Sequence, residues 1–328
     1  MLSPIEKTRL ERLLGTFERN FRVTRMYAEY LERYPEIISA QMVDALTDDG
    51  AVTREEALVA LLSEIFGLSF DNPSDRVIIR DYLTPSVRVL DTQKYKSNPY
   101  YKNISIPKIT DGAWEFRRES YAPYRAVICA DMIFDGFVEI PPLGFFTERF
   151  DFPAVLENGN EWMTLTPVDL DTCEDAIAAA HGKVVTFGLG LGYYAYMAAR
   201  RAEVESVTVV EKSEKVIELF KKYILPQFDC KDKIRIVEAD AFEYAERVMP
   251  RERYDVAFVD TWRDASDGTP MYERMRALEH LSKNTEFMYW IEGFLISRLR
   301  ALNLDSIIKK VECGSISVQD AEREIKNL

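Results

Sequence analysis

The spacing of apolar residues changes along the chain. Up to about residue 80, apolar residues recur every three or four positions, which is typical of helices with one buried face. Ser3 with Glu6, and Thr53 with Glu56, match the capping box with which many helices begin. These patterns predict a helical N-terminal region.

The segment between residues 84 and 124 lacks this helical spacing. It is rich in tyrosine, lysine, asparagine and proline, as in KYKSNPYYKNISIP, and we interpret it as an ordered, irregular connector. Short strands are expected near residues 125–129 and 136–140. The pair Asn158-Gly159 is typical of a tight turn between two strands.

From about residue 167, strands alternate with helices. The strand sequences are KVVTF, SVTVVE, KIRIVEA and YDVAFVD. Continuous apolar strands of this kind are typical of a parallel sheet that helices cover on both faces. We therefore predict an α/β fold, with a doubly wound, mostly parallel Rossmann-like sheet, a helical N-terminal region and short strands.

We place the domain boundary near residue 155. Residues 1–155 would form a helical region with a small β segment, which shapes a substrate pocket or a dimer surface. Residues 156–328 would form the Rossmann-like domain with a helical C-terminal tail. No final strand pair is evident after FMYWIEG, so we expect a shortened or rearranged sheet.

Composition narrows the classes of partner. The net charge of −13 disfavours a nucleic-acid partner, because an acidic surface repels phosphate backbones. Four cysteines without a CxxC pair and only two histidines do not indicate a metal site. The N-terminus lacks the apolar core of a secretion signal, and no run of eighteen apolar residues occurs. We expect a cytoplasmic protein without a membrane span and with a small-molecule substrate. A homodimer is left open as its assembly.

Three glycines follow the strand KVVTF. Gly188, Gly190 and Gly192 lie between this strand and a predicted helix. Glycines allow a tight turn and the close approach of a ligand, and the start of a helix favours negative groups. Glu211 ends the next strand, where a carboxylate can bind ribose hydroxyls. We favour this role over that of a solvated glutamate at a strand end.

The residue after Gly192 separates two classes of cofactor. A dinucleotide loop would have the pattern GxGxxG, but Tyr193 stands at the position of its last glycine. A bulky side chain there hinders the close strand–helix packing that dinucleotide binding needs. Of Tyr193 and Tyr194, we expect one to face the cofactor and the other to pack.

The third strand of the pattern ends in Asp240-Ala241-Phe242, and here the chain resembles class I S-adenosylmethionine-dependent methyltransferases. The resemblance covers about residues 160–295. It implies that Asp240 binds the adenine amino group and that the Ala241 N–H meets a ring nitrogen. It further implies S-adenosylmethionine as cofactor and S-adenosylhomocysteine as product. One departure is Thr186, where the family often has an acidic residue.

The fourth strand ends in Asp260, where the active site of this family opens. Asp260 would orient the acceptor or the cofactor, or else cap the loop, and Trp262 would form a wall of the pocket. Thr164 precedes the core in a segment that resembles a cofactor cover, so it is a candidate ligand. The competing interpretation is that Thr166 or Asp169 caps the next helix.

We therefore predict methyl transfer from S-adenosylmethionine to an unidentified, small acceptor. The main alternative is an aminopropyltransferase, because the build also resembles spermidine synthase. That group has an acidic residue in the glycine loop where this chain has Leu191, which disfavours decarboxylated S-adenosylmethionine. A non-catalytic cofactor-binding protein and an NAD-dependent oxidoreductase remain as further alternatives.

Overall fold

Contacts between residues divide the chain into two units that are not continuous in sequence. The computed structural model describes residues 2–328. The first unit, here the helical unit, comprises the chain up to Leu90, Ala122–Arg149 and Gly293–Leu328. The second, here the sheet unit, comprises Asp91–Tyr121 and Phe150–Glu292. This division differs from a single boundary near residue 155, because the C-terminal helices pack with the first helix.

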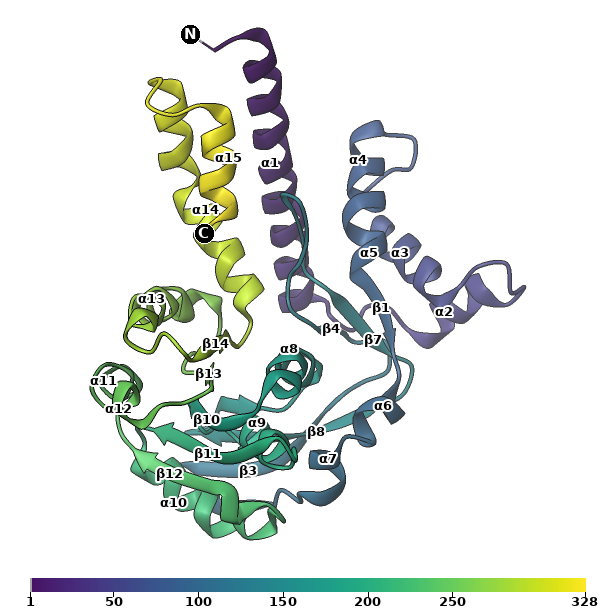
Figure 1. Ribbon diagram of the computed structural model, residues 1–328. Coiled ribbons are helices and arrows are strands. Elements are labelled where there is room, and N and C mark those ends of the chain that lie inside the picture. The colour runs from purple at the N-terminus through teal and green to yellow at the C-terminus, as the bar shows by residue number, and fades with distance from the viewer. Residues whose placement is uncertain (1) are drawn as a thin grey trace. The chain divides into compact units, whose positions relative to one another are not determined.

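The helical unit is organised around helix α1 (Pro4–Arg33). The capping box of Ser3 and Glu6 starts this helix as predicted, because the Ser3 side chain and the Glu6 carboxylate each bond to the other's backbone N–H. Apolar residues of α1 such as Leu10 and Phe17 are buried in one cluster with residues of α14 (Glu292–Glu312) and α15 (Val318–Lys326). The C-terminal part of the chain is thus helical (Figure 1), and it belongs to the helical unit.

The other elements of the helical unit are short. The capping box of Thr53 and Glu56 begins α3 (Arg54–Ile65), as predicted. Strands form a mixed three-stranded sheet in the order β1-β7-β4 and a separate β5-β6 hairpin. The remaining bounds are α2 (Ala40–Thr47), α4 (Pro73–Ile78), the π-helical turn η1 (Ile79–Leu83), α5 (Thr84–Ser86), β1 (Val87–Leu90), β4 (Ala126–Ile128), β5 (Ile133–Asp135), β6 (Val138–Ile140) and β7 (Leu143–Phe146).

The sheet unit contains the predicted doubly wound sheet. Five strands are hydrogen-bonded in the order β12-β11-β10-β13-β14, and all neighbours are parallel (Figure 1). The order reverses at β10, because the chain returns from β12 to the other side of β10. In such sheets, ligands bind outside the carboxyl ends of the strands at this reversal. The strands are β10 (Gly182–Phe187), β11 (Val204–Glu211), β12 (Ile234–Glu238), β13 (Val256–Val259) and β14 (Glu286–Tyr289).

Helices connect these strands and cover them. Helix α9 packs against β11, and α10 packs against β11 and β12. The bounds are α8 (Pro167–Ala179), α9 (Tyr193–Ala199), α10 (Glu214–Tyr223), α11 (Ala241–Arg247), α12 (Met249–Glu252) and α13 (Ala265–Arg276), with 3₁₀ turns at η2 (Leu225–Gln227), η3 (Lys231–Lys233) and η4 (Glu279–Leu281).

An antiparallel sheet precedes this core in the order β2-β3-β8-β9. The predicted turn at Asn158-Gly159 is confirmed: it joins β8 to β9, and both residues have positive φ, at 52° and 77°. The connector is less irregular than expected, because it contains the short helices α6 and α7, which Asp91 and Asn98 cap. The bounds are α6 (Thr92–Lys96), α7 (Pro99–Asn103), β2 (Ile109–Asp111), β3 (Trp114–Tyr121), β8 (Phe150–Glu157) and β9 (Asn160–Thr164).

No helix among residues 2–328 combines the length and the apolar character needed to cross a membrane.

Candidate nucleotide-binding site

The glycine loop joins β10 to α9 in a turn that only glycine fits. Gly188, Gly190 and Gly192 all have positive φ, at 100°, 50° and 75°. A Cβ atom on Gly188 would lie 1.8 Å from the Asp260 carbonyl oxygen, and one on Gly192 would lie 2.5 Å from the Phe220 ring. The loop therefore lies directly against the end of β13 and against α10.

A cleft of about 430 Å³ opens beside this loop. Its walls come from the residues that follow β10, β11, β12 and β13, so it occupies the carboxyl edge of the sheet at the point where strand order reverses. A volume of this size is in the range of small-molecule sites. The predicted site residues that line it are Gly188, Gly190, Glu211, Asp240, Ala241, Asp260 and Trp262.

Glu211 is held in one orientation at the end of β11. Its Oε2 accepts a hydrogen bond from the Leu189 N–H (3.2 Å), and its Oε1 accepts one from the Ser213 N–H (2.8 Å). The side chain is buried. The same carboxylate thus stabilises the glycine loop and the start of α10 while it reaches the cleft wall. A carboxylate oxygen has two lone pairs, so each oxygen can still accept a ligand hydroxyl.

Asp240 also has a structural role, at the start of α11. Its Oδ1 accepts hydrogen bonds from the N–H groups of Phe242 (2.9 Å) and Glu243 (3.0 Å). Oδ1 therefore caps the helix, and Oδ2 has no partner among the described residues. The Ala241 backbone and the Phe242 ring lie on the same wall, and the Arg274 guanidinium covers this ring at 4.0 Å from its centroid.

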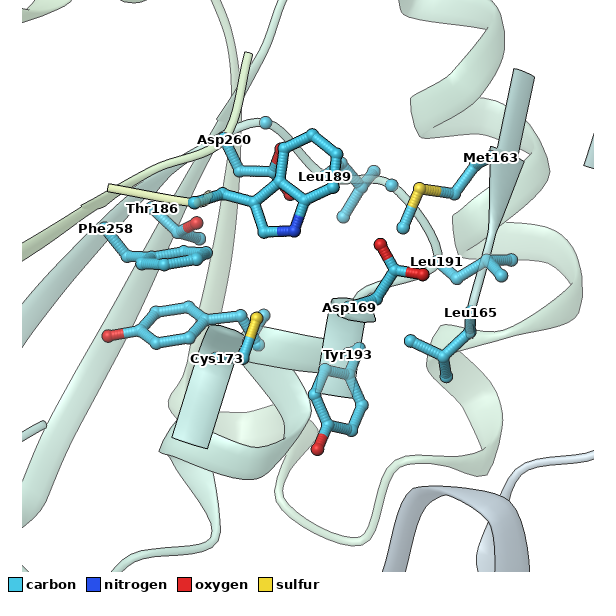
Figure 2. A pocket seen from close by; sticks show the side chains of 15 residues that line it. Met163, Leu165, Asp169, Cys173, Thr186, Leu189, Leu191, Tyr193, Phe258 and Asp260 are labelled. Atoms are coloured by element: carbon cyan, nitrogen blue, oxygen red, sulfur yellow. The ribbon is translucent and has the colours of Figure 1, made fainter. Parts of the chain in front are cut away.

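A second, smaller cavity of about 20 Å³ lies next to the cleft. The two share the lining residues Gly188, Leu189, Gly190, Met163 and Asp260. Figure 2 shows the Asp169 carboxylate and the Cys173 sulfur, both from α8, pointing into this cavity.

Asp260 is the most strongly perturbed acid of the site. Burial raises its pKa from 3.8 to about 8, and the nearby charges of Asp169 and Glu211 add to this rise. Burial also raises the pKa of Asp169, to about 6, although hydrogen bonds from Thr166 oppose the shift. The pKa of the Cys173 thiol is raised by burial and by both aspartates. A strongly perturbed acid in a cleft is typical of functional sites.

Four of the predicted site residues do not line the cleft. Gly192 serves the turn into α9, and Thr164 is paired with Ala154 in the antiparallel sheet. Tyr193 and Tyr194 both line the smaller cavity. Neither tyrosine lines the larger cleft.

Each tyrosine is held by close neighbours. The Tyr193 hydroxyl accepts a hydrogen bond from the Asn98 side chain (3.0 Å). The ring of Tyr194 stacks on Phe258, with centroids 4.2 Å apart. Both side chains are buried. Tyr193, which follows Gly192, therefore packs inside the protein beneath the glycine loop.

The alternative interpretation of the segment before α8, that Thr166 or Asp169 caps this helix, agrees with the structure. The Thr166 N–H and hydroxyl both donate to Asp169 Oδ2, at 2.7 and 2.8 Å, and this box starts the helix. Because Thr166 and Asp169 match a helix-capping pattern, the sequence did not indicate that Asp169 also lines the small cavity. A second omission concerns β9, where Trp162 and Met163 line the cleft while Thr164 does not.

Two polar groups beside Asp260 have no partner among residues 2–328. They are the Thr261 hydroxyl and the Trp262 indole N–H, both buried. Trp262 lines the cleft and stacks on Tyr289, with ring centroids 6.4 Å apart. Within the same residues, no group of three or more His, Cys, Asp or Glu side chains is arranged to hold a metal ion.

Comparison with known proteins gives distant likenesses. No protein-family model and no curated protein matches the chain. Spermidine synthase from Thermotoga maritima is 18% identical with a TM-score of 0.31, over 45% of this chain and 56% of that one. A spermidine synthase in complex with the transition-state analogue AdoDATO is 21% identical with a TM-score of 0.31, over 41% and 50%.

A candidate O-methyltransferase from Klebsiella pneumoniae is 18% identical with a TM-score of 0.24, over 30% of this chain and 44% of that one. The chain thus spans about half the length of these solved structures. These likenesses are partial and distant.

Proposed function

We propose that the cleft binds S-adenosylmethionine and that the chain transfers the methyl group to a small acceptor. The main support for this proposal is that Glu211, Asp240 and Ala241 line the same cleft as the glycine loop. Glu211 would accept hydrogen bonds from ribose hydroxyls, and the unpartnered Asp240 Oδ2 would accept one from an exocyclic amino group. The Ala241 backbone lies beside it for a ring nitrogen.

The packing below the loop supports this cofactor over NAD. In a dinucleotide loop the last glycine lets helix and strand pack closely. Here that position is Tyr193, whose ring is buried against Tyr100, with centroids 5.6 Å apart. The cleft also suits one nucleoside with a short substituent, since its volume is about 430 Å³.

Asp260 is the candidate for the reacting end of the site. It follows β13, lines both the cleft and the smaller cavity, and has a pKa raised to about 8 by burial. In its ionised form, which grows in population as pH approaches 8, such a carboxyl can accept a proton, as a general base must. Methyl transfer otherwise needs mainly the alignment of donor and acceptor, which the rigid loop would provide.

Aminopropyl transfer remains the second candidate, and one observation favours it. Leu191 is buried and carries no charge, but Asp169 brings a carboxylate from α8 to the cavity that Leu191 lines. The lack of an acid inside the glycine loop is therefore a weaker objection than the sequence indicates. Decarboxylated S-adenosylmethionine belongs in any test.

Thermal-shift measurements test the cofactor, because a ligand that binds only the folded state raises the melting temperature. We expect stabilisation by S-adenosylmethionine and S-adenosylhomocysteine and none by NAD. Stabilisation by NAD alone would overturn the proposal. Preference for decarboxylated S-adenosylmethionine would favour aminopropyl transfer. Binding without transfer to any offered acceptor would favour a non-catalytic protein.

A further inference from the structure

A short helix that precedes the core bonds to the backbone of the glycine loop. Helix α7 packs against α9, and both belong to the sheet unit. The Tyr100 hydroxyl, on α7, donates a hydrogen bond of 2.6 Å to the Leu191 carbonyl. Leu191 is the residue between the second and third glycines of the loop. Tyr100 therefore fixes the direction of a carbonyl group inside the loop.

Tyr100 is itself held in place by its surroundings. Its side chain is 1% exposed. Its ring lies edge-on against three aromatic rings, with centroids 5.6, 5.7 and 6.3 Å away, which belong to Tyr193, Tyr196 and Phe228. Burial raises the pKa of the Tyr100 hydroxyl, so this group keeps its proton and can donate a hydrogen bond. The donor of the bond to Leu191 is thus fixed both in position and in protonation.

Asn98 supports the same arrangement. Its Oδ1 accepts a hydrogen bond from the Tyr100 N–H (2.8 Å) at the start of α7, and its Nδ2 donates one to the Tyr193 hydroxyl (3.0 Å). Tyr193 is the first residue of α9, directly after the loop. The segment around α7 is therefore bonded both to the loop and to the helix that follows it.

The loop does not fix this part of its backbone by sterics. The peptide between Leu191 and Gly192 turns about the ψ angle of Leu191 and the φ angle of Gly192, and glycine places few limits on φ. Two hydrogen bonds hold the peptide instead. Its N–H donates to the Leu189 carbonyl at 2.8 Å, and its carbonyl accepts from Tyr100. Because a flip of the peptide breaks both bonds, the Tyr100 hydroxyl stabilises the observed conformation.

Tyr100 reaches the site only through the loop. It lines neither the cleft nor the smaller cavity, so it does not contact a ligand in either. Leu191 lines the smaller cavity, and its neighbour Gly190 lines both. Glu211, which lines the cleft, holds the loop at the Leu189 N–H. The loop is thus bonded to one side chain inside the cleft wall and to one outside it.

We propose that Tyr100, supported by Asn98, is a positioning residue that sets the conformation of the glycine loop before a ligand arrives. A loop that is already ordered loses less conformational entropy on binding, so it binds the same ligand more tightly. This consequence for binding rests on the proposed function, because it assumes a nucleoside in the cleft. The order of the loop in the unliganded protein does not depend on that assumption.

Hydrogen–deuterium exchange of the unliganded protein tests the order of the loop. Tyr100→Phe keeps the ring and its aromatic contacts but removes the donor to Leu191. We expect amide exchange in residues 188–196 to become about threefold to tenfold faster, as for one lost hydrogen bond that opposes local opening. Exchange in β11 and β12 should stay at the native rate. Native exchange in the loop would overturn the proposal, and so would an equal rise throughout the sheet unit.

Calorimetry with S-adenosylhomocysteine tests the consequence for binding. Tyr100→Phe should bind it about threefold to tenfold more weakly. Asn98→Ser is a second, milder variant, because serine can still start α7 but is too short to replace the amide that bonds to Tyr193. It should change exchange and affinity in the same direction by less, and it decides the question if Tyr100→Phe does not fold. Faster loop exchange with native affinity would overturn the positioning role.

Thr285→Val is the matched control. The Thr285 hydroxyl also donates to a backbone carbonyl, that of Tyr254, at 2.7 Å. Thr285 directly precedes β14, at the edge of the parallel sheet opposite to the cleft. The variant should lower the melting temperature about as much as Tyr100→Phe does, but keep native loop exchange and native affinity. If it changed both as Tyr100→Phe does, the effect would be one of general stability and the proposal would be wrong.

Failure of the proposed cofactor is distinguishable from failure of this inference. If S-adenosylhomocysteine does not bind the native protein, the cofactor assignment fails, and loop exchange alone decides the role of Tyr100. Faster exchange in Tyr100→Phe, confined to the loop and α9, then supports the positioning role. Exchange at the native rate overturns it.

Discussion

The two ends of the candidate site use carboxylates in different ways. At the ends of β11 and β12, Glu211 and Asp240 accept two backbone N–H groups each. At the other end, Asp260 has no hydrogen-bond donor among the described residues, and its pKa is raised to about 8 by burial. The first pair is positioned by the backbone before any ligand arrives. The second end is left with a charge that only a proton or a ligand can balance.

The glycine loop joins these two ends, and its first glycine should be the most sensitive position. Gly188→Ala would place a Cβ 1.8 Å from the Asp260 carbonyl oxygen, so β13 must move away from the loop. We expect a loss of about 5 kcal/mol or more in the free energy of unfolding, at the upper end of single substitutions. Chemical denaturation measures it.

Gly112→Ala is the control for backbone strain alone. Gly112 also has positive φ, at 63°, but its Cβ would meet no atom within 4 Å. A cost of only about 1–2 kcal/mol is expected. If the two variants lost the same free energy of unfolding, the close contact between Gly188 and the end of β13 would contribute nothing beyond backbone strain.

Asp260 should make stability depend on pH. Its pKa is about 8 in the folded chain against an ordinary value of 3.8, so the folded state binds more protons between these values. The free energy of unfolding should therefore fall as pH rises from about 4 to 8. Because the carboxyl is partly accessible from the cleft, we expect a fall of about 2–4 kcal/mol.

Asp260→Asn should remove most of that fall in denaturation curves recorded across this pH range. A smaller fall of the same sign should remain up to about pH 6, from the raised pKa of Asp169. Asp175→Asn, on an exposed position, should keep the full dependence. If the stability of the native protein did not change between pH 4 and 8, Asp260 would not have the raised pKa that distinguishes its end of the site.

Glu211 should matter most for the ligand. Glu211→Gln keeps the size of the side chain but replaces one carboxylate oxygen with an NH₂ group. Only one oxygen then remains to accept hydrogen bonds from Leu189, Ser213 and the ligand. We expect binding of S-adenosylhomocysteine to weaken by about 1–3 kcal/mol, as measured by calorimetry. Glu205→Gln, an exposed position on the same strand, should bind like the native protein. Unchanged affinity in folded Glu211→Gln would remove this residue from the site.

Asp240 combines a small structural effect with a binding effect, and two substitutions separate them. Asp240→Ala loses the cap of α11 and should cost about 1 kcal/mol of stability. Asp240→Ser keeps a capping oxygen and should retain that stability. Both should weaken nucleoside binding by about 1–3 kcal/mol, because both lose Oδ2. If Asp240→Ser binds normally, Asp240 acts only as a helix cap.

Much of the sheet could be predicted because its signals are local. The apolar strands, the capping boxes of α1 and α3 and the Asn158-Gly159 turn each lie within a few adjacent residues. The short helices α6 and α7 were missed, because five-residue helices show little periodicity. Their capping residues, Asp91 and Asn98, were the available signal.

The candidate site was predictable where its residues follow strands directly. Glu211, Asp240 and Asp260 each stand at a strand end, and parallel strands bring these ends to one edge. Thr164 was assigned to the site by its place in the sequence, but the cleft is lined by its neighbours Trp162 and Met163. Because Trp162 and Met163 are consecutive, the alternation of side chains along a strand does not by itself select the residues that reach the cleft.

The sequence by itself determined the strands, the glycine turn and the acids that close the strands, because periodicity, capping and positive φ depend on neighbouring residues. Only the tertiary structure decided that Asp169 and Asp260, far apart in the chain, line one cavity without a basic residue. It also decided that the chain divides into units made of separate segments. Both depend on how helices pack across long sequence separations, and this packing has no local signature.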